Sequence, residues 1–139
     1  MPRKDKVHDL VKASLVNDGW DITKEPYYVN SLSADYEVDI AAEKWIVASK
    51  ENIKIAVEVK SFLNASFAHA FHGILGQYLN YAALMFLQEP DRVLYLSVPS
   101  DVYAQHFHQP ATAFVLQLYR VNLLIFNPLT KKIEQWISN

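Results

Sequence analysis

The stretch IKIAVEVKSF, residues 53–62, has the alternating pattern of a β-strand. Successive side chains of a strand point to opposite faces, so the β-branched residues share one face while Ala56, Glu58 and Lys60 share the other. A carboxylate and an ammonium group on a strand flanked by Val and Ile must be solvated, paired or bound to a ligand. The stretch therefore predicts a strand that carries a polar site on one of its faces.

A second strand-like stretch, residues 36–48, comes before it and carries Asp39. An Asp on one strand and Glu-x-Lys on the next is the pattern of metal-dependent nucleases. Asp39 and Glu58 supply the oxygen ligands that Mg²⁺ (or Mn²⁺) prefers, and Lys60 can orient the attacking water or stabilise negative charge on a phosphate. Glu43 has the same strand parity as Asp39 and is an alternative metal ligand. The competing interpretation is an exposed Glu-x-Lys that forms an ordinary cross-strand ion pair.

Residues 66–88 predict a long helix with a broad apolar stripe, directly after the Glu58 strand. Gln77 and Tyr81 are four residues apart and therefore lie on one face of this helix. We expect both side chains to face the two carboxylates, where they would support the site or contact DNA. A tyrosine at the edge of the core and a capping glutamine are the alternative.

His69 and His72 are three residues apart near the start of the same helix. This spacing places two imidazoles on one side of a helix, but zinc sites need further ligands and no third His or Cys lies nearby in the sequence. Two exposed polar positions are the simpler interpretation, and the sequence leaves their role open.

The remaining segments complete a mixed α/β pattern. Helices are expected at residues 5–18, after Ser100 and at 111–119, and strands at 20–23, 27–29, 92–98, 121–126 and 132–137. A long helix followed by a buried strand suggests a crossover to a parallel neighbour. The fold class predicted is α/β (α+β), with a mixed β-sheet flanked by helices.

Composition limits the kinds of protein that this chain can be. It has 139 residues, 51% hydrophobic and 20% charged, no cysteine, and no apolar run long enough for a membrane span. We expect one domain over residues 1–139, soluble and cytoplasmic, with no membrane partner. The net charge of −2 predicts weak DNA binding by the isolated chain, because duplex affinity comes largely from neutralised phosphates.

Five motifs spread over the chain point to a known family. They are Val57-Glu58-Val59-Lys60-Ser61-Phe62, Gly76-Gln77-Tyr78-Leu79-Asn80-Tyr81, Asp5-x-x-His8, Asp18-Gly19-Trp20 and Asp39-Ile40-Ala41-Ala42-Glu43-Lys44. Together they resemble the XisH family, the element-excision controlling factors associated with programmed removal of a DNA element from a ferredoxin gene. The similarity runs over nearly the whole chain.

This resemblance implies a restriction-endonuclease-like fold of the PD-(D/E)xK nuclease superfamily. Carried over residue by residue, the superfamily's first acid falls on Asp39, its second acid on Glu58 and its lysine on Lys60, while the helix motif of some branches falls on Gln77 and Tyr81. No Pro precedes Asp39, where the name of the motif expects one. The implied activity is Mg²⁺-dependent DNA endonuclease action in DNA excision. The alternative is a non-catalytic DNA- or protein-binding accessory factor that acts with the companion excision factor XisI.

Aromatic residues in the C-terminal half suggest an assembly larger than one chain. Phe107, Phe114, Tyr119 and Trp136 supply enough aromatic surface for a protein interface, although most should be core. We therefore expect a self-associated or partner-bound form, and this assembly rather than the lone chain would bind DNA.

Overall fold

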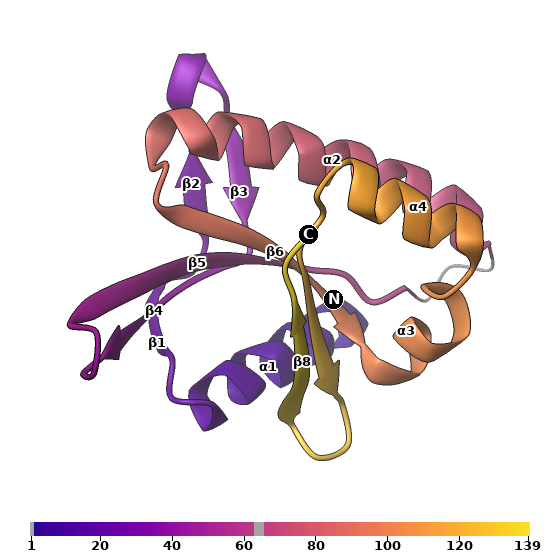
Figure 1. Ribbon diagram of the computed structural model, residues 1–139, viewed down its shortest axis with the longest axis horizontal. Helices are drawn as coiled ribbons and strands as arrows, with labels where there is room; N and C mark the ends of the chain where they lie inside the picture. Colours follow the sequence, from indigo (N-terminus) through magenta and orange to yellow (C-terminus); the bar gives the residue numbers. More distant parts are fainter. Residues whose placement is uncertain (1, 63–65) are drawn as a thin grey trace.

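The computed structural model describes residues 2–62 and 66–139, which form a mixed sheet flanked by helices (Figure 1). Its elements are α1 (Pro2–Asn17), β1 (Asp21–Lys24), β2 (Tyr27–Val29), the 3₁₀ turn η1 (Ser31–Ser33), β3 (Tyr36–Val38), β4 (Ile40–Ile46), β5 (Glu51–Val59), α2 (Phe67–Gln88), β6 (Arg92–Pro99), α3 (Ser100–His106), α4 (Pro110–Leu118), β7 (Leu123–Asn127) and β8 (Lys132–Ile137). The predicted α/β (α+β) class, a mixed sheet with helices on it, is confirmed. No helix among the described residues is long and apolar enough to cross a membrane.

The main sheet has six strands in the order β1-β4-β5-β6-β7-β8. The pairs β5–β6 and β6–β7 are parallel, and the outer pairs are antiparallel. Helix α2 makes the crossover from β5 to its parallel neighbour β6, as the sequence predicted. Because a parallel connection needs such a crossover, the sheet holds α2 against the face on which β5 presents Glu58.

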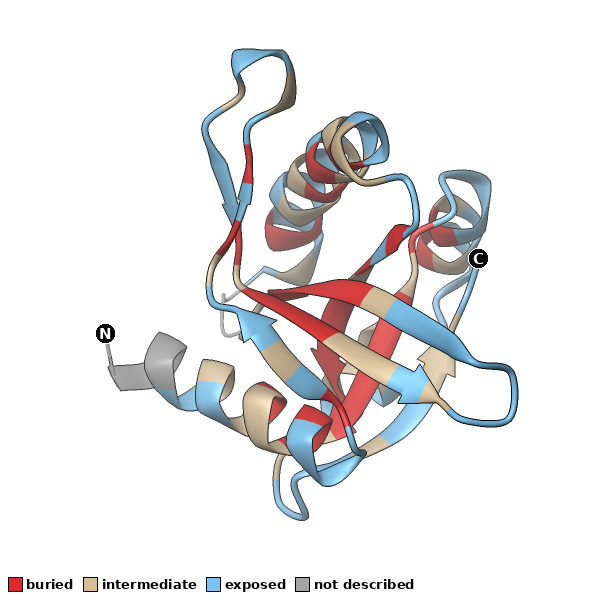
Figure 2. Cartoon of the chain, turned by 90° about the vertical axis from the view of Figure 1, so that its left-hand side faces the viewer, coloured by how far each residue is buried: buried red, intermediate tan, exposed pale blue. Residues whose placement is uncertain are grey.

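Two apolar clusters lie on opposite faces of this sheet (Figure 2). On one face, α1 packs against the β-branched residues of β5 and the even-numbered residues of β7. On the other, α2, α3 and α4 pack against Ala56 and the odd-numbered residues of β7. The predicted alternation of β5 is therefore confirmed, with its β-branched face toward α1 and its Ala56–Glu58 face toward α2.

The predicted single strand over residues 36–48 is wrong. Its first part, β3, pairs with β2 in a separate two-stranded sheet, and its second part, β4, pairs with β1 and β5 in the main sheet. The break between them falls at Asp39. Alternation of apolar residues continues across the break, so periodicity alone could not show that the chain changes sheets there.

The helix ends follow the capping signals in the sequence. Gly19, which follows the predicted helix over residues 5–18, has φ +91°, and its N–H donates to Val16 O at 3.0 Å. This left-handed conformation is costly for residues with a Cβ. At the start of α2 the Ser66 hydroxyl accepts a hydrogen bond from the His69 N–H, which is the role of an N-cap.

The β2–β3 sheet stands beside the C-terminal half of α2 and is held there by Gln88 (Figure 1). The Gln88 side chain accepts from Asn30 N at 2.8 Å and donates to Tyr28 O at 2.8 Å and to the Tyr27 hydroxyl at 3.2 Å. The Ser31 hydroxyl adds a bond to Leu84 O at 2.7 Å. These contacts place β3, and hence Asp39 at its end, next to α2.

We expect Gln88→Ala to lower the free energy of unfolding by about 2 kcal/mol, because several hydrogen bonds of about 1 kcal/mol each are lost and the backbone groups of the β2–β3 sheet lose their partner. Urea unfolding followed by circular dichroism measures this change. The matched control is Gln117→Ala near the end of α4, an exposed glutamine, which should change the unfolding free energy by less than about 0.5 kcal/mol. Equal effects of the two substitutions would contradict the role given to Gln88.

Candidate active site

A polar pocket of about 390 Å³ opens where the end of β5, the break between β3 and β4, and the middle of α2 meet. Its lining residues are Asp35, Tyr36, Glu37, Asp39, Glu58, Val59, Lys60, Gln77 and Tyr81. Five of them were predicted as site residues from the sequence: Asp39, Glu58, Lys60, Gln77 and Tyr81. The fold thus brings together side chains from two strands and a helix in one pocket.

Glu58 is the most buried carboxylate of this pocket, with 5% of the residue exposed. Its Oε1 atom is buried and has no hydrogen-bond partner among the described residues. Burial and, next, the negative charge of Asp39 together raise the pKa of Glu58 to about 8, although the ammonium group of Lys60 opposes both. A carboxylate in this position costs free energy unless a cation or a proton neutralises it.

Asp39 and Lys60 are the charged neighbours of this carboxylate. One oxygen of Asp39 accepts a hydrogen bond of 2.7 Å from the Val59 N–H, which ties the break after β3 to the end of β5. A carboxylate has two oxygens, so Asp39 can accept this bond with one and bind a cation with the other. Lys60, one residue past β5, has its Nζ 3.3 Å from Glu58 Oε2. The shared face predicted for Glu58 and Lys60 is confirmed.

Gln77 and Tyr81 close the pocket from α2. Gln77 Nε2 donates to the Tyr81 hydroxyl at 2.8 Å, so the two residues form a pair one helical turn apart. Burial, and next the charge of Glu58, raise the pKa of Tyr81. Its phenol therefore keeps its proton at neutral pH and can donate it in a hydrogen bond. The ring of Tyr36 packs against that of Tyr81, with centroids 5.4 Å apart, and joins β3 to the helix.

Three residues named in the sequence analysis lie outside this pocket. Glu43 is four residues along from Asp39, about 13 Å in a strand, and pairs with Arg92, whose Nη2 is 3.0 Å from Glu43 Oε2. The structure therefore groups Glu43 with a different charge cluster rather than with Asp39 and Glu58. His69 and His72 are exposed on the first turns of α2, and neither lines the pocket.

The comparison with protein families agrees with the motifs in the sequence. The family model described as XisH protein matches residues 1–134. The chain belongs to the XisH family. Two crystal structures have the same fold: an XisH family protein from Nostoc punctiforme, with a TM-score of 0.88, and an fdxN element excision controlling factor protein from Anabaena variabilis, with a TM-score of 0.87.

Both relatives are 38% identical to this chain, and each alignment covers 96% of it. The alignments cover 99% of the Nostoc chain and 98% of the Anabaena chain, so this XisH family member matches its relatives over their full length. No curated protein matches the sequence.

Sequence reasoning missed part of the wall of the XisH pocket. Asp35, Tyr36 and Glu37 line the pocket but were not predicted as site residues. Asp35, Glu37 and Asp39 alternate along an extended segment, which is the signal that could have placed all three carboxylates on one side. With Glu58 they give the pocket four carboxylates against the single ammonium group of Lys60.

The pocket fits a hard divalent cation better than zinc. Residues 2–62 and 66–139 contain no group of three or more His, Cys, Asp or Glu side chains arranged to hold a metal. Mg²⁺ does not need such a group, because it keeps several waters and takes one or two carboxylates. Asp39 and Glu58 meet that need, and the buried Glu58 Oε1 without a hydrogen-bond partner is the atom that such a cation would satisfy.

Proposed function

We propose that this XisH family member is a divalent-metal-dependent DNA endonuclease that takes part in programmed DNA excision. The observation that carries the proposal is Glu58, a buried carboxylate with one oxygen that has no hydrogen-bond partner among the described residues, close to Asp39 and Lys60. An acid from one strand with Glu-x-Lys from the next also resembles the site of the PD-(D/E)xK nuclease superfamily. The description of the Anabaena relative as an excision controlling factor favours DNA excision as the setting.

A bound cation accounts for the charge of the pocket. The carboxyl groups of the pocket outnumber its lysine and disfavour a DNA phosphate unless a cation offsets them. When bound by Asp39 and Glu58, Mg²⁺ or Mn²⁺ would supply a positive charge for the scissile phosphate and lower the pKa of a bound water.

The residues around the carboxylates have separate tasks. Lys60 donates hydrogen bonds to the phosphate oxygens and stabilises the charge that grows on them during attack by water. Tyr81, held by Gln77 and protonated at neutral pH, donates a hydrogen bond to a DNA phosphate or to a carboxylate of the site. The hydrogen bond from the Val59 N–H positions the Asp39 carboxylate in advance of substrate binding.

The test is cleavage of supercoiled and linear DNA by the purified protein with Mg²⁺ or Mn²⁺, and again with excess EDTA. We expect nicked or linearised products with either metal and none with EDTA. Absence of products with both metals, for protein that is folded by circular dichroism, would contradict the endonuclease proposal.

We expect Lys60→Met to lower the cleavage rate by about 100-fold while metal binding is kept, because the lysine acts on the phosphate and not on the cation. Calorimetric titration with Mn²⁺ and single-turnover cleavage measure the two properties separately. The matched control is Lys54→Met, in β5 but paired with Glu89 and Asp91 away from the pocket, which should leave the rate unchanged. Loss of metal binding in Lys60→Met would show that the lysine has another role.

A second proposed function is that of an accessory factor that binds DNA or protein without cutting. The net charge of −2 and the word "controlling" in the description of the Anabaena relative favour it. The cleavage assay repeated with the companion excision factor XisI separates the two functions. Cleavage by the mixture that survives Glu58→Gln would assign the chemistry to the companion.

A further inference from the structure

Helices α2 and α4 lie side by side on the outer side of the sheet (Figures 1 and 2). Neither helix contains an Asp, Glu, Lys or Arg, although 20% of the whole chain is charged. The surface of a protein that stays monomeric is usually rich in charged residues. An outer face built from these two helices alone is therefore neutral and unusually apolar for a surface in water.

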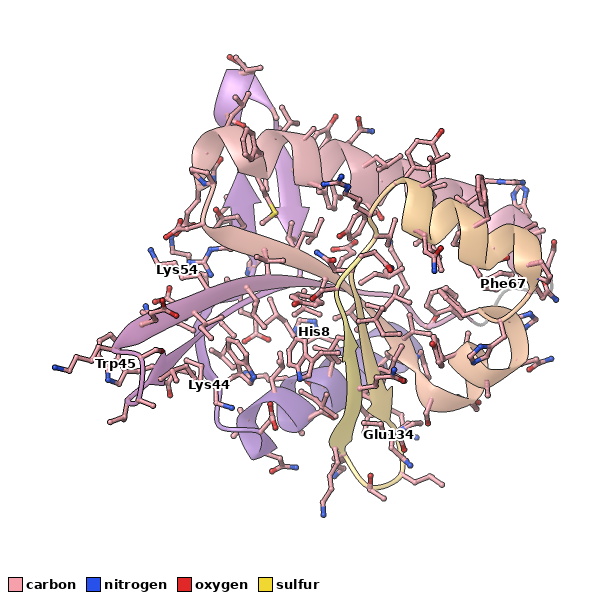
Figure 3. The ribbon with its side chains drawn as sticks, viewed as in Figure 1. His8, Lys44, Trp45, Lys54, Phe67 and Glu134 are labelled. Carbon is pink, nitrogen blue, oxygen red and sulfur yellow. The ribbon has the colours of Figure 1, made fainter. Side chains whose placement is uncertain are left out.

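A groove of about 310 Å³ runs between the two helices. Its lining residues are Phe67, Ala68, Phe71, His72, Leu75, Gln109, Ala111, Thr112 and Val115. Phe67 lies at the end of α2 beside α3 (Figure 3), where its ring stacks on that of His106 with centroids 4.3 Å apart. The groove thus has an aromatic floor that is packed in place, and small residues on its walls.

Large apolar side chains project beside this groove. Phe114 is 64% exposed and Leu118 is 58% exposed, one turn apart on α4. Phe86 and Leu87, at the C-terminal end of α2, are 68% and 58% exposed. Phe114 and Leu118 follow the α4 wall of the groove, whereas Phe86 and Leu87 lie beyond the part of α2 that lines it. Exposed large apolar side chains of this kind are typical of an interaction surface. We call the outer surface of α2 and α4 the α2–α4 face.

We propose that the α2–α4 face is the interface through which two copies of this chain associate. Nucleic acid is a poor occupant, because the face has no Lys or Arg to neutralise phosphates. A charged protein surface would lose its hydration there without gaining a partner. The matching surface must be apolar and uncharged, and a second α2–α4 face has these properties.

The face is also complementary to itself. In a two-fold interface the same patch on both subunits meets, so a ridge on one copy must fill a groove on the other. The α2–α4 face carries both: the Phe114–Leu118 ridge and, next to it, the groove lined by Leu75 and Val115. In the proposed dimer, each ridge would fill the groove of the partner.

The size of the face is sufficient for a small dimer interface. Helix α2 has 22 residues, and a helix of that length extends about 33 Å. Helix α4 has 9 residues and extends about 14 Å, so at a width of about 10 Å per helix the two helices present a footprint of roughly 450–500 Å². Two such footprints bury about 900–1,000 Å² in total, which is the lower end of the range for specific interfaces.

The glycines in the middle of α2 bear on whether a second copy of the chain binds this face. Gly73 and Gly76 are exposed, and a Cβ built on either would meet no atom within 4 Å. Glycine weakens a helix interior relative to alanine, and nothing within the subunit requires it at these two positions. Gly76 is four residues after His72, which lines the groove, so a helix that approaches closely from a second copy would require glycine there. Gly73 is four residues before Gln77 and lies on the side of the carboxylate pocket, so it does not bear on this face.

The α2–α4 face and the carboxylate pocket use different sides of α2. Gln77 and Tyr81 line the carboxylate pocket, whereas Ala68, His72 and Leu75 line the groove. Association through this face therefore leaves the pocket open, and the inference does not depend on the proposed nuclease activity.

The test is the mass of the purified full chain, measured by light scattering after size exclusion at tens of micromolar. We expect twice the 16.0 kDa of one chain for the wild type, and 16.0 kDa for Phe114→Glu, because a buried unpaired carboxylate raises the dissociation constant by at least about 100-fold. The matched control is Leu129→Glu on the β7–β8 turn, where the side chain is 90% exposed, and it should keep the dimer.

Circular dichroism checks that each variant is folded, and Leu118→Lys is the second variant on the same ridge should Phe114→Glu unfold. A wild type of 16.0 kDa would overturn the proposal, even if it bound a different protein through this face. A dimer that survives both ridge substitutions, or that Leu129→Glu also disrupts, would overturn it as well.

Discussion

Glu58→Gln should make the metal-free protein more stable at pH 8, by a few kcal/mol, while it abolishes metal-dependent cleavage. Glutamine has nearly the shape of glutamate and stays neutral, so it removes the cost of a buried charge beside Asp39. Most substitutions of a buried residue destabilise a protein. A gain in stability combined with a loss of function is therefore a specific signature of a site that is strained without its cation.

The pH dependence of this effect follows from the raised pKa of Glu58. The folded carboxyl has a pKa of about 8, against 4.5 for the unconstrained group, so between these values the folded state holds a proton that the unfolded state has lost. The stability contributed by Glu58 is fully present below about pH 4.5 and is lost as the pH rises through 8. The wild type should lose roughly 1.4 kcal/mol per pH unit in this interval, and Glu58→Gln should lack this slope.

Adding a divalent metal should reduce the loss of stability with rising pH in the wild type, but not in Glu58→Gln. Mg²⁺ or Mn²⁺ stabilises the ionised carboxylate, so its binding near pH 7 should release about one proton from Glu58 and flatten the loss of stability. Urea unfolding from pH 5 to 8.5, and calorimetry in two buffers of different ionisation enthalpy, measure both effects. Glu37→Gln, at the exposed wall of the same pocket, is the control that should keep the slope. A wild type with no such slope would contradict the assignment of Glu58.

The prediction from the sequence was most accurate for β5, whose two faces pack against different helices. The alternation in residues 53–59 placed Glu58 opposite the β-branched residues, and both faces of β5 agree with that pattern. The prediction of a single strand over residues 36–48 was wrong. The same alternation continues through β3 and β4, although the chain passes from one sheet into another at Asp39. A change of pairing partner is a long-range property, and local periodicity does not record it.

The pocket residues were also predicted from local periodicity, and long-range contacts again limited the prediction. Glu58 and Lys60 share a strand, and Gln77 and Tyr81 share a helical face, so local geometry brought each pair together. The choice between Asp39 and Glu43 could not be made by parity, because both point to the same side of the strand. Arg92 separates them in the structure, and a long-range ion pair of this kind leaves no local signal in the sequence.

Arg92→Met should lower the free energy of unfolding by about 3–5 kcal/mol, the cost of removing one partner from a buried ion pair. Only 2% of the Arg92 side chain is exposed. Its guanidinium donates to Glu89 Oε1 at 2.7 Å, to Glu43 Oε2 at 3.0 Å and to Ile55 O at 2.9 Å, and it lies 5.0 Å from the ring centre of Tyr27. Methionine fills the volume but leaves two carboxylates and a carbonyl without their donor.

Lowering the pH should reduce the difference in the free energy of unfolding between Arg92→Met and the wild type. The hydrogen bond from Arg92 holds the pKa of Glu89 at about 2, below its usual 4.5, so this stabilisation is present above about pH 4.5 and is lost as the pH falls through 2. Urea unfolding at pH 6 and pH 2.5 measures the change. Lys54→Met is the matched control, because Lys54 contacts Glu89 with a side chain that is 30% exposed and should contribute less than about 1 kcal/mol. An equal loss in the two variants, or no dependence on pH, would mean that the Arg92 cluster does not stabilise the joint between β4, β6 and the end of α2.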